Sequence, residues 1–245
     1  MIYITGDIHG EAWRFCDEYM PGESKWTADD KLIVCGDFGL IWYNSDDYTG
    51  KKSDDMALDD LATRPYNILA VDGNHENFNE LYKYPEVERY GAPVHKIRDN
   101  IYHLERGRIY TIEDKKFFIF GGAYSVDKGM RQENISWWRQ ELPNDEEYKR
   151  GIEALKNAGN QVDYIITHTA PNGIIKEMLQ MYPLIEDGEL TGFFDWIMFE
   201  IDFEKWFFGH FHIDESFKAF IRGKEKEFHA LFNDVKTIED KLNLE

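Results

Sequence analysis

The sequence predicts an α/β protein in which two β-sheets pack against each other and helices cover the outside. Three observations lead to this prediction. Short apolar runs recur along the chain, and most of them end at a glycine or another turn residue. Helix-compatible stretches separate the early runs, which is the spacing of parallel strands joined by crossover helices. Later runs follow one another closely with only turn residues between them, as antiparallel strands do.

The parallel strands are expected where four to six β-branched, aromatic or aliphatic residues stand together. Such runs are typical of strands that are buried on both faces of a sheet. They cover residues 1–5, 31–35, 67–71, 164–167 and 205–208. The antiparallel strands are expected as a β-meander over 94–98, 101–104, 108–112 and 116–120, and as a hairpin of 215–221 with 227–232. The turn of that hairpin is Arg222-Gly223-Lys224.

Helices are expected between and after these strands, over residues 11–19, 54–62, 77–84, 136–142 and 145–158. The stretch 44–55 is polar and contains a glycine, so we interpret it as a surface loop, or as an insertion near a functional edge. No composition shift marks a linker, and we therefore expect one domain over residues 1–245.

The composition excludes several classes of protein. The 245 residues carry 28 Lys and Arg against 47 Asp and Glu, a formal net charge of -19, and the mean hydropathy is -0.58. No apolar run approaches the roughly 20 residues of a membrane-spanning helix, and the acidity disfavours anionic membrane surfaces and non-specific nucleic-acid binding. Cys16 and Cys35 form no CxxC pair, which disfavours a thiolate metal site. The first residues lack the features of a signal peptide, so we expect a cytoplasmic protein.

Polar residues of one particular kind follow the predicted parallel strands. They are Asp7, His9, Asp37, Asn74, His75, His168, His210 and His212. Ligands of open α/β sheets bind beyond the carboxyl ends of the strands. Imidazole, carboxylate and amide groups suit divalent Mn, Fe, Co or Zn. Because five separate strand ends each supply such a residue, a metal site explains the set better than unrelated turn formers and caps.

The spacing adds detail to this interpretation. Asp7 with His9, and His210 with His212, are i, i+2 pairs, whose side chains point to the same side of an extended backbone. Glycines precede Asp7, Asp37, Asn74 and His210, and let the backbone turn sharply beside an ion. Seven of the eight groups could hold two ions with a carboxylate such as Asp37 between them. Two ions about 4 Å apart can clamp a phosphoryl group and ionise a bridging water.

The same residues form a series that resembles a known family. The segments are Gly6-Asp7-Ile8-His9-Gly10, Gly36-Asp37, Gly73-Asn74-His75-Glu76, Thr167-His168 and Gly209-His210-Phe211-His212. They are similar to the motifs GDxHG, GD, GNH[ED], H and GHxH of the calcineurin-like metallophosphoesterases, in the order of that family. The resemblance implies a four-layer α-β-β-α sandwich of two mixed sheets with a dinuclear metal site.

Carried over residue by residue, the resemblance implies two overlapping ligand sets. One ion would take Asp7, His9, Asp37 and His212, and the other would take Asp37, Asn74, His168 and His210. His75 matches the catalytic histidine of the family, which implies that it stabilises developing charge or protonates the leaving oxygen.

The second motif departs from the protein Ser/Thr phosphatases of the family, which have GDxVDRG where this sequence has GDFGLIW at 36–42. The Asp that orients the catalytic histidine and the Arg that grips the phosphate are therefore absent. We expect Asp72, Glu76 or a backbone carbonyl to orient His75. Arg131, at the end of the glycine-rich segment 121–131, is the better candidate for the phosphate, and Lys128 is the weaker one because it is not bidentate. A turn with a solvated charged cluster is the other interpretation of that segment.

Other residues of interest are assigned to packing. His95, His103 and His229 lack glycine partners and are expected on the surface or in packing contacts. Cys35 is expected to be a small buried hydrophobic residue, and Trp137-Trp138 to pack rather than to stack on a nucleobase.

We therefore predict a metal-dependent phosphoesterase that cleaves a phosphate mono- or diester by direct attack of a hydroxide held by two metal ions. Mn²⁺ is the expected ion among Mn, Fe, Zn, Co and Ni, and a nucleotide is among the expected substrates. A metallophosphoesterase fold used as a binding module, or a Ser/Thr protein phosphatase-like enzyme, are the alternatives. The presence of His75 and all seven ligand residues favours an enzyme.

Overall fold

Two mixed β-sheets form the centre of the molecule, as the sequence predicts. The computed structural model describes residues 1–180 and 188–240. The first sheet has seven strands in the order β13-β1-β2-β3-β6-β5-β4. Their bounds are β1 (Ile2–Thr5), β2 (Lys31–Val34), β3 (Asn67–Ala70), β4 (Glu86–Arg89), β5 (Ala92–Lys96), β6 (Ile101–Leu104) and β13 (Val235–Thr237).

The second sheet has six strands in the order β11-β12-β10-β9-β8-β7. Their bounds are β7 (Arg108–Ile112), β8 (Lys115–Phe120), β9 (Tyr164–Thr167), β10 (Lys205–Phe208), β11 (Glu215–Ile221) and β12 (Lys224–Ala230). In both sheets the central strands are parallel and the edges are antiparallel: β1, β2, β3 and β6 run together in the first sheet, and β8, β9, β10 and β12 in the second. The carboxyl ends of the parallel strands in each sheet therefore lie along one edge.

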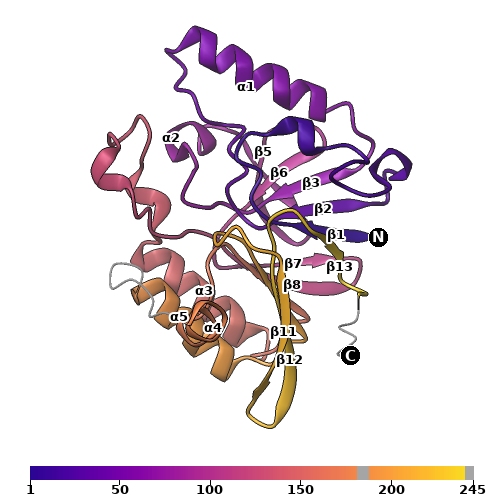
Figure 1. Cartoon of the computed structure of the whole chain (residues 1–245), viewed down its shortest axis with the longest axis vertical. Coiled ribbons are helices and arrows are strands. Elements are labelled where there is room, and N and C mark those ends of the chain that lie inside the picture. Colours follow the sequence, from indigo (N-terminus) through magenta and orange to yellow (C-terminus); the bar gives the residue numbers. More distant parts are fainter. Residues whose placement is uncertain (181–187, 241–245) are drawn as a thin grey trace.

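Helices cover the outer face of each sheet, which completes the four layers (Figure 1). Helix α1 (Tyr48–Leu61) lies over the first sheet, and α3 (Asp145–Asn157), α4 (Asn172–Leu179) and α5 (Gly188–Glu200) lie over the second. The short α2 (Phe78–Leu81) follows β3. Asp47 caps α1 by accepting from the Gly50 N–H, and Asn144 with Glu147 forms a capping box at the start of α3.

The alternation of side chains along the strands builds three apolar layers. In β2, Leu32 and Val34 point to α1, and Ile33 points to the second sheet. In β9, Ile165 points to the helices and Ile166 to the first sheet. Because both faces of each sheet are covered, the central strands are apolar at nearly every position, and this explains why they appear in the sequence as uninterrupted apolar runs.

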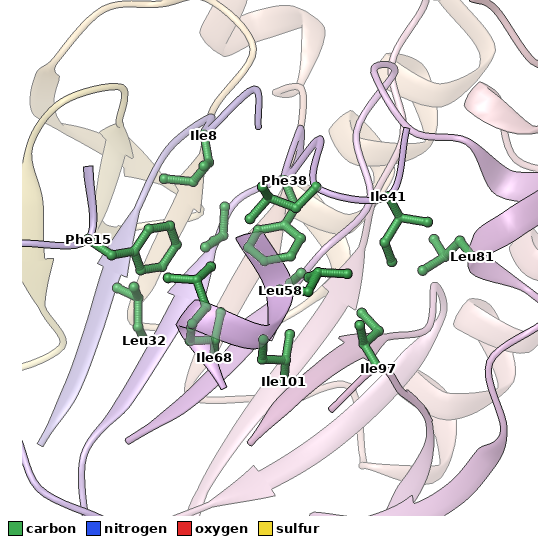
Figure 2. Packing of buried hydrophobic residues seen from close by; sticks show 14 of the residues in the cluster. Ile8, Phe15, Leu32, Phe38, Ile41, Leu58, Ile68, Leu81, Ile97 and Ile101 are labelled. Atoms are coloured by element: carbon green, nitrogen blue, oxygen red, sulfur yellow. The ribbon is translucent and has the colours of Figure 1, made fainter. Parts of the chain in front are cut away.

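Figure 2 shows the outer layer of the first sheet, where Leu32 and Ile68 of the strands lie near Leu58 of α1. The buried residues of α1 are Gly50, Asp54, Leu58 and Leu61, at the spacing of one helix face. Ile8 and Phe38, from the loops that carry the predicted metal ligands, are buried in the same cluster. The loops that carry the predicted ligands are therefore anchored in the apolar layer between the first sheet and α1.

The expected β-meander is wrong in its connectivity. Strands β5 and β6 belong to the first sheet, whereas β7 and β8 form a hairpin in the second. The chain passes from one sheet to the other through Glu105, Arg106 and Gly107. Gly107 has a φ of 71°, and a Cβ there would lie 2.8 Å from the Gly151 nitrogen of α3. The passage of the chain between the two sheets depends on this close backbone contact, which the hydrophobic periodicity of the sequence does not reveal.

Several helix predictions also differ from the structure. Residues 11–19 contain only the 3₁₀ turn Ala12–Arg14, and residues 136–142 only Arg139–Glu141. The helix expected over 77–84 is limited to Phe78–Leu81, whereas α1 begins six residues earlier than expected, at Tyr48 instead of 54, and takes in most of the stretch interpreted as a loop. The Asp47 cap explains that early start.

The predicted hairpin is confirmed as β11 and β12, which pair from Glu215 with Ala230 to Ile221 with Lys224. Strands β4 and β13 and helices α4 and α5 are additional elements that the sequence analysis did not include. Strand β12 pairs with β10, and β13 pairs with β1, so the segment after residue 214 is hydrogen-bonded into both sheets. Within the described ranges, no helix has the length and apolar character needed to cross a membrane.

Candidate metal centre

The eight polar residues singled out in the sequence all follow parallel strands, and the two sheets bring them to one place. Asp7 and His9 follow β1, Asp37 follows β2, and Asn74 with His75 follows β3. His168 follows β9, and His210 with His212 follows β10. The first sheet thus supplies four of the seven predicted ligands and the second sheet supplies three, which meet between the two sheets. We call these seven residues the metal centre.

One half of the metal centre is formed by Asp7, His9 and His212. The Nε2 atoms of His9 and His212 are 2.9 Å apart, and His212 Nε2 lies 3.1 Å from Asp7 Oδ2. His9 Nε2 is 3.7 Å from the same oxygen and 3.8 Å from Asp37 Oδ2. These donor atoms lie close enough to one another to share one cation.

The other half is formed around His168, whose side chain is fully buried. Its Nε2 lies 3.0 Å from Asn74 Oδ1 and 3.4 Å from Asp37 Oδ2. The His210 ring lies beside it, with 5.0 Å between ring centroids. Asp37 Oδ2 therefore faces both His9 and His168, which is the position that a bridging carboxylate requires.

The tautomer of His168 indicates to which half of the centre Asp7 belongs. Its Nδ1 is 2.8 Å from the Cys35 carbonyl oxygen, so Nδ1 carries the proton and donates it there. That leaves Nε2 as the coordinating atom, facing Asp37 and Asn74. Asp7, Asp37 and His168 also lie close enough to one another to share a cation. Asp7 Oδ1, however, lies 3.8 Å from Nδ1, on the protonated side, which favours Asp7 as a partner of His9 and His212.

Four of the predicted ligands have a left-handed backbone: φ is 51° at His9, 49° at Asp37, 69° at His210 and 53° at His212. The extended conformation that we expected for the two i, i+2 pairs is therefore wrong. The side chains of each pair still reach the same centre because the chain curls around it. Left-handed backbone costs a non-glycine residue roughly 1–2 kcal/mol, and four of the eleven described non-glycine residues with positive φ gather at this one centre.

The glycines before Asp37 and Asn74 allow the loops to approach each other closely. A Cβ on Gly36, where φ is 95°, would lie 2.1 Å from His168 Nδ1, and one on Gly73 would lie 2.0 Å from Asp37 Oδ1. No other residue fits at these positions without moving a ligand. The prediction that glycine permits close approach here is thus supported by the packing.

The charges of the metal centre fit divalent cations. The side chains of Asp7 and Asp37 are buried, and within the described parts of the chain their ion-pair partners are all imidazoles. Burial alone would lower the pKa of His168, but the Asp37 and Asp7 carboxylates raise it, and the bond to Asp7 raises the pKa of His212. Burial and the neighbouring His168 lower the pKa of His210 to about 4. Cations in the same place would neutralise both carboxylates and leave every imidazole free to coordinate.

His75 lies next to the centre but is turned toward the rim. Its backbone N–H donates to Asp37 Oδ1 over 2.7 Å, and its ring packs edge-on to His9 with 5.1 Å between centroids. Arg131 lies against the imidazole: Nη1 is 3.2 Å from Nδ1, and Nη2 is 3.1 Å from Nε2. A neutral imidazole accepts at one nitrogen only, so the pair makes one hydrogen bond. Burial lowers the pKa of His75; Asp37 opposes this, and Arg131 adds to it.

Arg131 is thus the residue at the nitrogens of the His75 ring, while His9 and Trp42 pack against the ring itself. The expectation that Asp72, Glu76 or a backbone carbonyl orients His75 is wrong for the described residues. Asp72 instead accepts from His103 and Arg106 in a buried network. Glu76 accepts from the Phe38 N–H and so holds the turn that follows Asp37. Burial and the nearby Asp37 raise the pKa of Glu76 well above its usual range.

The segment 121–131 contains a positioning group that the sequence analysis missed. Asn74 Nδ2 donates to Ser125 Oγ over 3.1 Å, which turns the amide oxygen toward His168. The only signal for Ser125 in the sequence is its place in this glycine-rich segment. Lys128 lies over the rings of Tyr124 and Trp137. Arg131 pairs with Asp127 over 2.8 Å as well as touching His75, so this segment forms a rim of the site.

The residues assigned to packing lie outside the centre. His103 is buried against Asp72, His229 is buried beside Phe207, and His95 stacks on His103. None of the three is on the surface. Trp138 is buried in the core of the first sheet. Cys35 is buried, and burial raises the pKa of its thiol; its backbone carbonyl, and not its side chain, serves the site.

A search of solved structures found similar chains at low sequence identity. A candidate 5'-nucleotidase from Staphylococcus aureus, in complex with alpha-ketoglutarate, has a TM-score of 0.53 and 14% identity over 96% of this chain and 49% of its own. This chain therefore spans about half the length of that protein. Protein TT1561 of Thermus thermophilus has a TM-score of 0.48 and 11% identity, covering 95% of this chain and 89% of its own. A phosphopantetheinyl hydrolase from Mycobacterium tuberculosis has a TM-score of 0.40 and 14% identity, covering 94% and 89%.

A comparison with curated proteins found no match. The comparison with protein families was decisive. The family model of the calcineurin-like phosphoesterases matches residues 1–214, which include every residue of the metal centre as well as His75 and Arg131. This match, together with the two-sheet fold and the donor set, shows that the chain belongs to the calcineurin-like phosphoesterases.

Proposed function

We propose that this protein hydrolyses a phosphate mono- or diester with two divalent cations held at the metal centre, Mn²⁺ being the first ion to test. The observation that carries the proposal is the convergence of seven residues with oxygen and nitrogen donors from both sheets, with Asp37 between the two halves. Two cations there would neutralise the charge on the phosphoryl oxygens and lower the pKa of a water molecule to near neutrality.

The distances support the two ligand sets that the family resemblance implies, and His210 is included because its ring lies beside that of His168. Asp7, His9 and His212 would hold one cation, and Asn74, His168 and His210 the other. Asp37 would serve both, because its Oδ2 faces His9 at 3.8 Å and His168 at 3.4 Å. The Cys35 carbonyl keeps His168 in the tautomer that coordinates through Nε2, and Ser125 directs the oxygen of Asn74.

His75 and Arg131 would act on the substrate from the rim. His75 is not needed as a ligand, and its ring lies beside that of His9. It would protonate the leaving oxygen or stabilise the charge that develops on it. The Arg131 guanidinium touches both nitrogens of that ring and would also grip a phosphoryl oxygen, the task that the Arg of GDxVDRG performs in the protein phosphatases.

The substrate class is open between mono- and diesters. The solved structure with a TM-score of 0.53 is described as a candidate 5'-nucleotidase, which makes nucleotides a reasonable first panel. At 14% identity, that likeness concerns the fold. The absence of the GDxVDRG motif disfavours a Ser/Thr protein phosphatase-like enzyme.

The test begins with protein stripped by a chelator and reloaded with Mn²⁺, Ni²⁺, Co²⁺, Zn²⁺ or Fe²⁺. Hydrolysis of nitrophenyl phosphate and of bis(nitrophenyl) phosphate then separates monoesterase from diesterase activity. Asp37→Asn should lower the metal content, and it should lower turnover by at least about 100-fold because both cations lose a ligand. Asp29→Asn, the same change at an exposed position, is the matched control.

Full metal content with normal turnover in Asp37→Asn would exclude the bridging role. If the reloaded wild-type protein binds two equivalents of Mn²⁺ and hydrolyses no ester in the panel, the fold serves as a binding module instead.

A further inference from the structure

A cavity of about 350 Å³ opens directly beside the metal centre. His9 and His75 line the end that faces the predicted metals. Trp42, Tyr43, Asp54 and Ala57 line the rest, so that the cavity extends from the reacting centre to helix α1. Its volume lies at the lower end of the range of small-molecule pockets, about 300–1,000 Å³. It therefore suits part of a small substrate and not a folded protein surface.

The two aromatic residues of this cavity are held in place by the chain around them. Asp54 Oδ2 accepts from the backbone N–H groups of Trp42 and Tyr43, at 2.8 and 2.9 Å. The Trp42 ring packs edge-on against the buried Trp138, with 5.4 Å between centroids.

Tyr43 lies against Gly50 of α1, where a Cβ would be 2.2 Å from its ring. Its side chain keeps substantial exposure, at 41% for the residue. A glycine in the first turns of a helix weakens that helix, and here it makes room for the ring. Both aromatic walls are thus preorganised, which lowers the entropy lost when a flat group packs on them.

The charge of the cavity selects what can enter it. Among the residues that the structure describes, no Lys or Arg lines the cavity, and the one charged side chain that faces it away from the histidines is the Asp54 carboxylate. A phosphate would be repelled there, so the phosphoryl group must stay at the metal centre beside His75. The part that enters is uncharged, flat enough to pack on Trp42 and Tyr43, and able to donate hydrogen bonds to Asp54 or to Ser53 on the same helix.

We propose that this cavity binds the ring-bearing alcohol of the phosphate ester and that the substrate is a nucleoside monophosphate, with its heterocycle against Trp42 and Tyr43. The proposal rests on the proposed function for the chemistry, but the cavity can be tested by binding alone. A nucleobase supplies both properties that the walls select, a flat ring and N–H donors at its edge.

Ala57 gives a sharp test because it lines the cavity from α1 and lies outside the metal centre. In the Mn²⁺-loaded protein, Ala57→Phe fills the cavity and should lower kcat/KM for the common nucleoside 5'-monophosphates by about 10- to 100-fold. The loss for methyl phosphate, which has no group to enter the cavity, should be much smaller. Met56→Phe places the same ring on the neighbouring exposed position and is the matched control. Tyr43→Ala serves as a second variant should Ala57→Phe fail to fold.

Equilibrium binding of the unphosphorylated nucleosides by calorimetry adds a readout that needs no catalysis. Binding to the wild type and to Met56→Phe, but at least tenfold weaker binding to Ala57→Phe and Tyr43→Ala, supports the proposal. If wild-type protein cleaves methyl phosphate as well as the nucleotides, and no nucleoside binds, the cavity assignment is wrong while the proposed function stands. If nucleosides bind and no ester is cleaved, the proposed function fails and the cavity assignment stands. A preference for phenyl phosphate over every nucleotide would overturn the nucleoside in favour of a plain aromatic group.

Discussion

Arg131 offers a prediction in which the distances set the magnitude. Its guanidinium nitrogens lie 3.2 and 3.1 Å from the two nitrogens of His75, and its side chain is only 16% exposed. One hydrogen bond to a charged group contributes about 1.5–3 kcal/mol. Since about 1.4 kcal/mol corresponds to a factor of ten, Arg131→Ala should lower kcat/KM by about 10- to 100-fold. Arg131→Lys keeps the charge but loses the fork, so it should recover only part of that loss.

Steady-state kinetics on the Mn²⁺-loaded protein separate two ways in which Arg131 could act. If it grips the phosphoryl group, KM should rise. If it acts through His75, kcat should fall, and the double variant with His75→Ala should lose little more than His75→Ala alone. Arg139→Ala is the control and should be neutral, because Arg139 lies in the same connection between β8 and α3 and its side chain is 77% exposed. Unchanged kinetics in Arg131→Ala would show that both contacts with His75 are incidental and would refute the reasoning.

Three further predictions concern His75, the buried Arg106 and His229. His75→Ala should lower kcat by about 10²–10⁴-fold, and more for an alkyl phosphate than for nitrophenyl phosphate. The metal content should stay unchanged, and loss of an ion would instead show that His75 is a ligand. Arg106 is buried against Asp72, so Arg106→Met should lower the free energy of unfolding of chelator-treated protein by about 3–5 kcal/mol, or its melting temperature by about 10 °C. The exposed control Arg139→Met should change the free energy of unfolding by less than about 1 kcal/mol. Equal effects of the two variants would contradict a structural role for the buried pair. Burial, with Lys205 and Lys236, lowers the pKa of His229 to about 4, so folding disfavours its protonation. The contribution of His229 to stability should be complete above about pH 6.5 and should fall by up to about 3 kcal/mol toward pH 4, whereas His229→Gln should lose less stability over that range. Equal slopes of the two proteins in pH-dependent denaturation would rule out this role of His229.

The sequence predicted the central strands well because these are covered on both faces. Continuous apolar runs such as 67–71 and 164–167 have few other interpretations in a chain of this size. Helices were harder. Helix α5 buries one face, from Leu190 to Met198, but Phe193, Trp196 and Phe199 lie outside that face. Its sequence therefore lacks the polar face that marks an amphipathic helix. Helix α1 begins earlier than its composition indicates because the Asp47 cap and the packing of Tyr43 on Gly50 stabilise a polar first turn.

The residues of the candidate metal centre could be predicted from the sequence, because ligand chemistry depends on residue type and the strand ends fix the order of the residues. Only the tertiary structure decided how those residues meet. Asp37 faces both His9 and His168 because two separate sheets converge there, and the left-handed backbone at four ligands has no signature in a residue pattern.

The same limit applies to the rim and the cavity. No local pattern indicates that Arg131 reaches His75, 56 residues away in the chain, or that Trp42 and Tyr43 face a cavity beside the same histidine. Local sequence determines which side chains are available and which segments form strands. The long-range packing of loops between two sheets decides which of those side chains share one site, because that packing depends on contacts that no short segment contains.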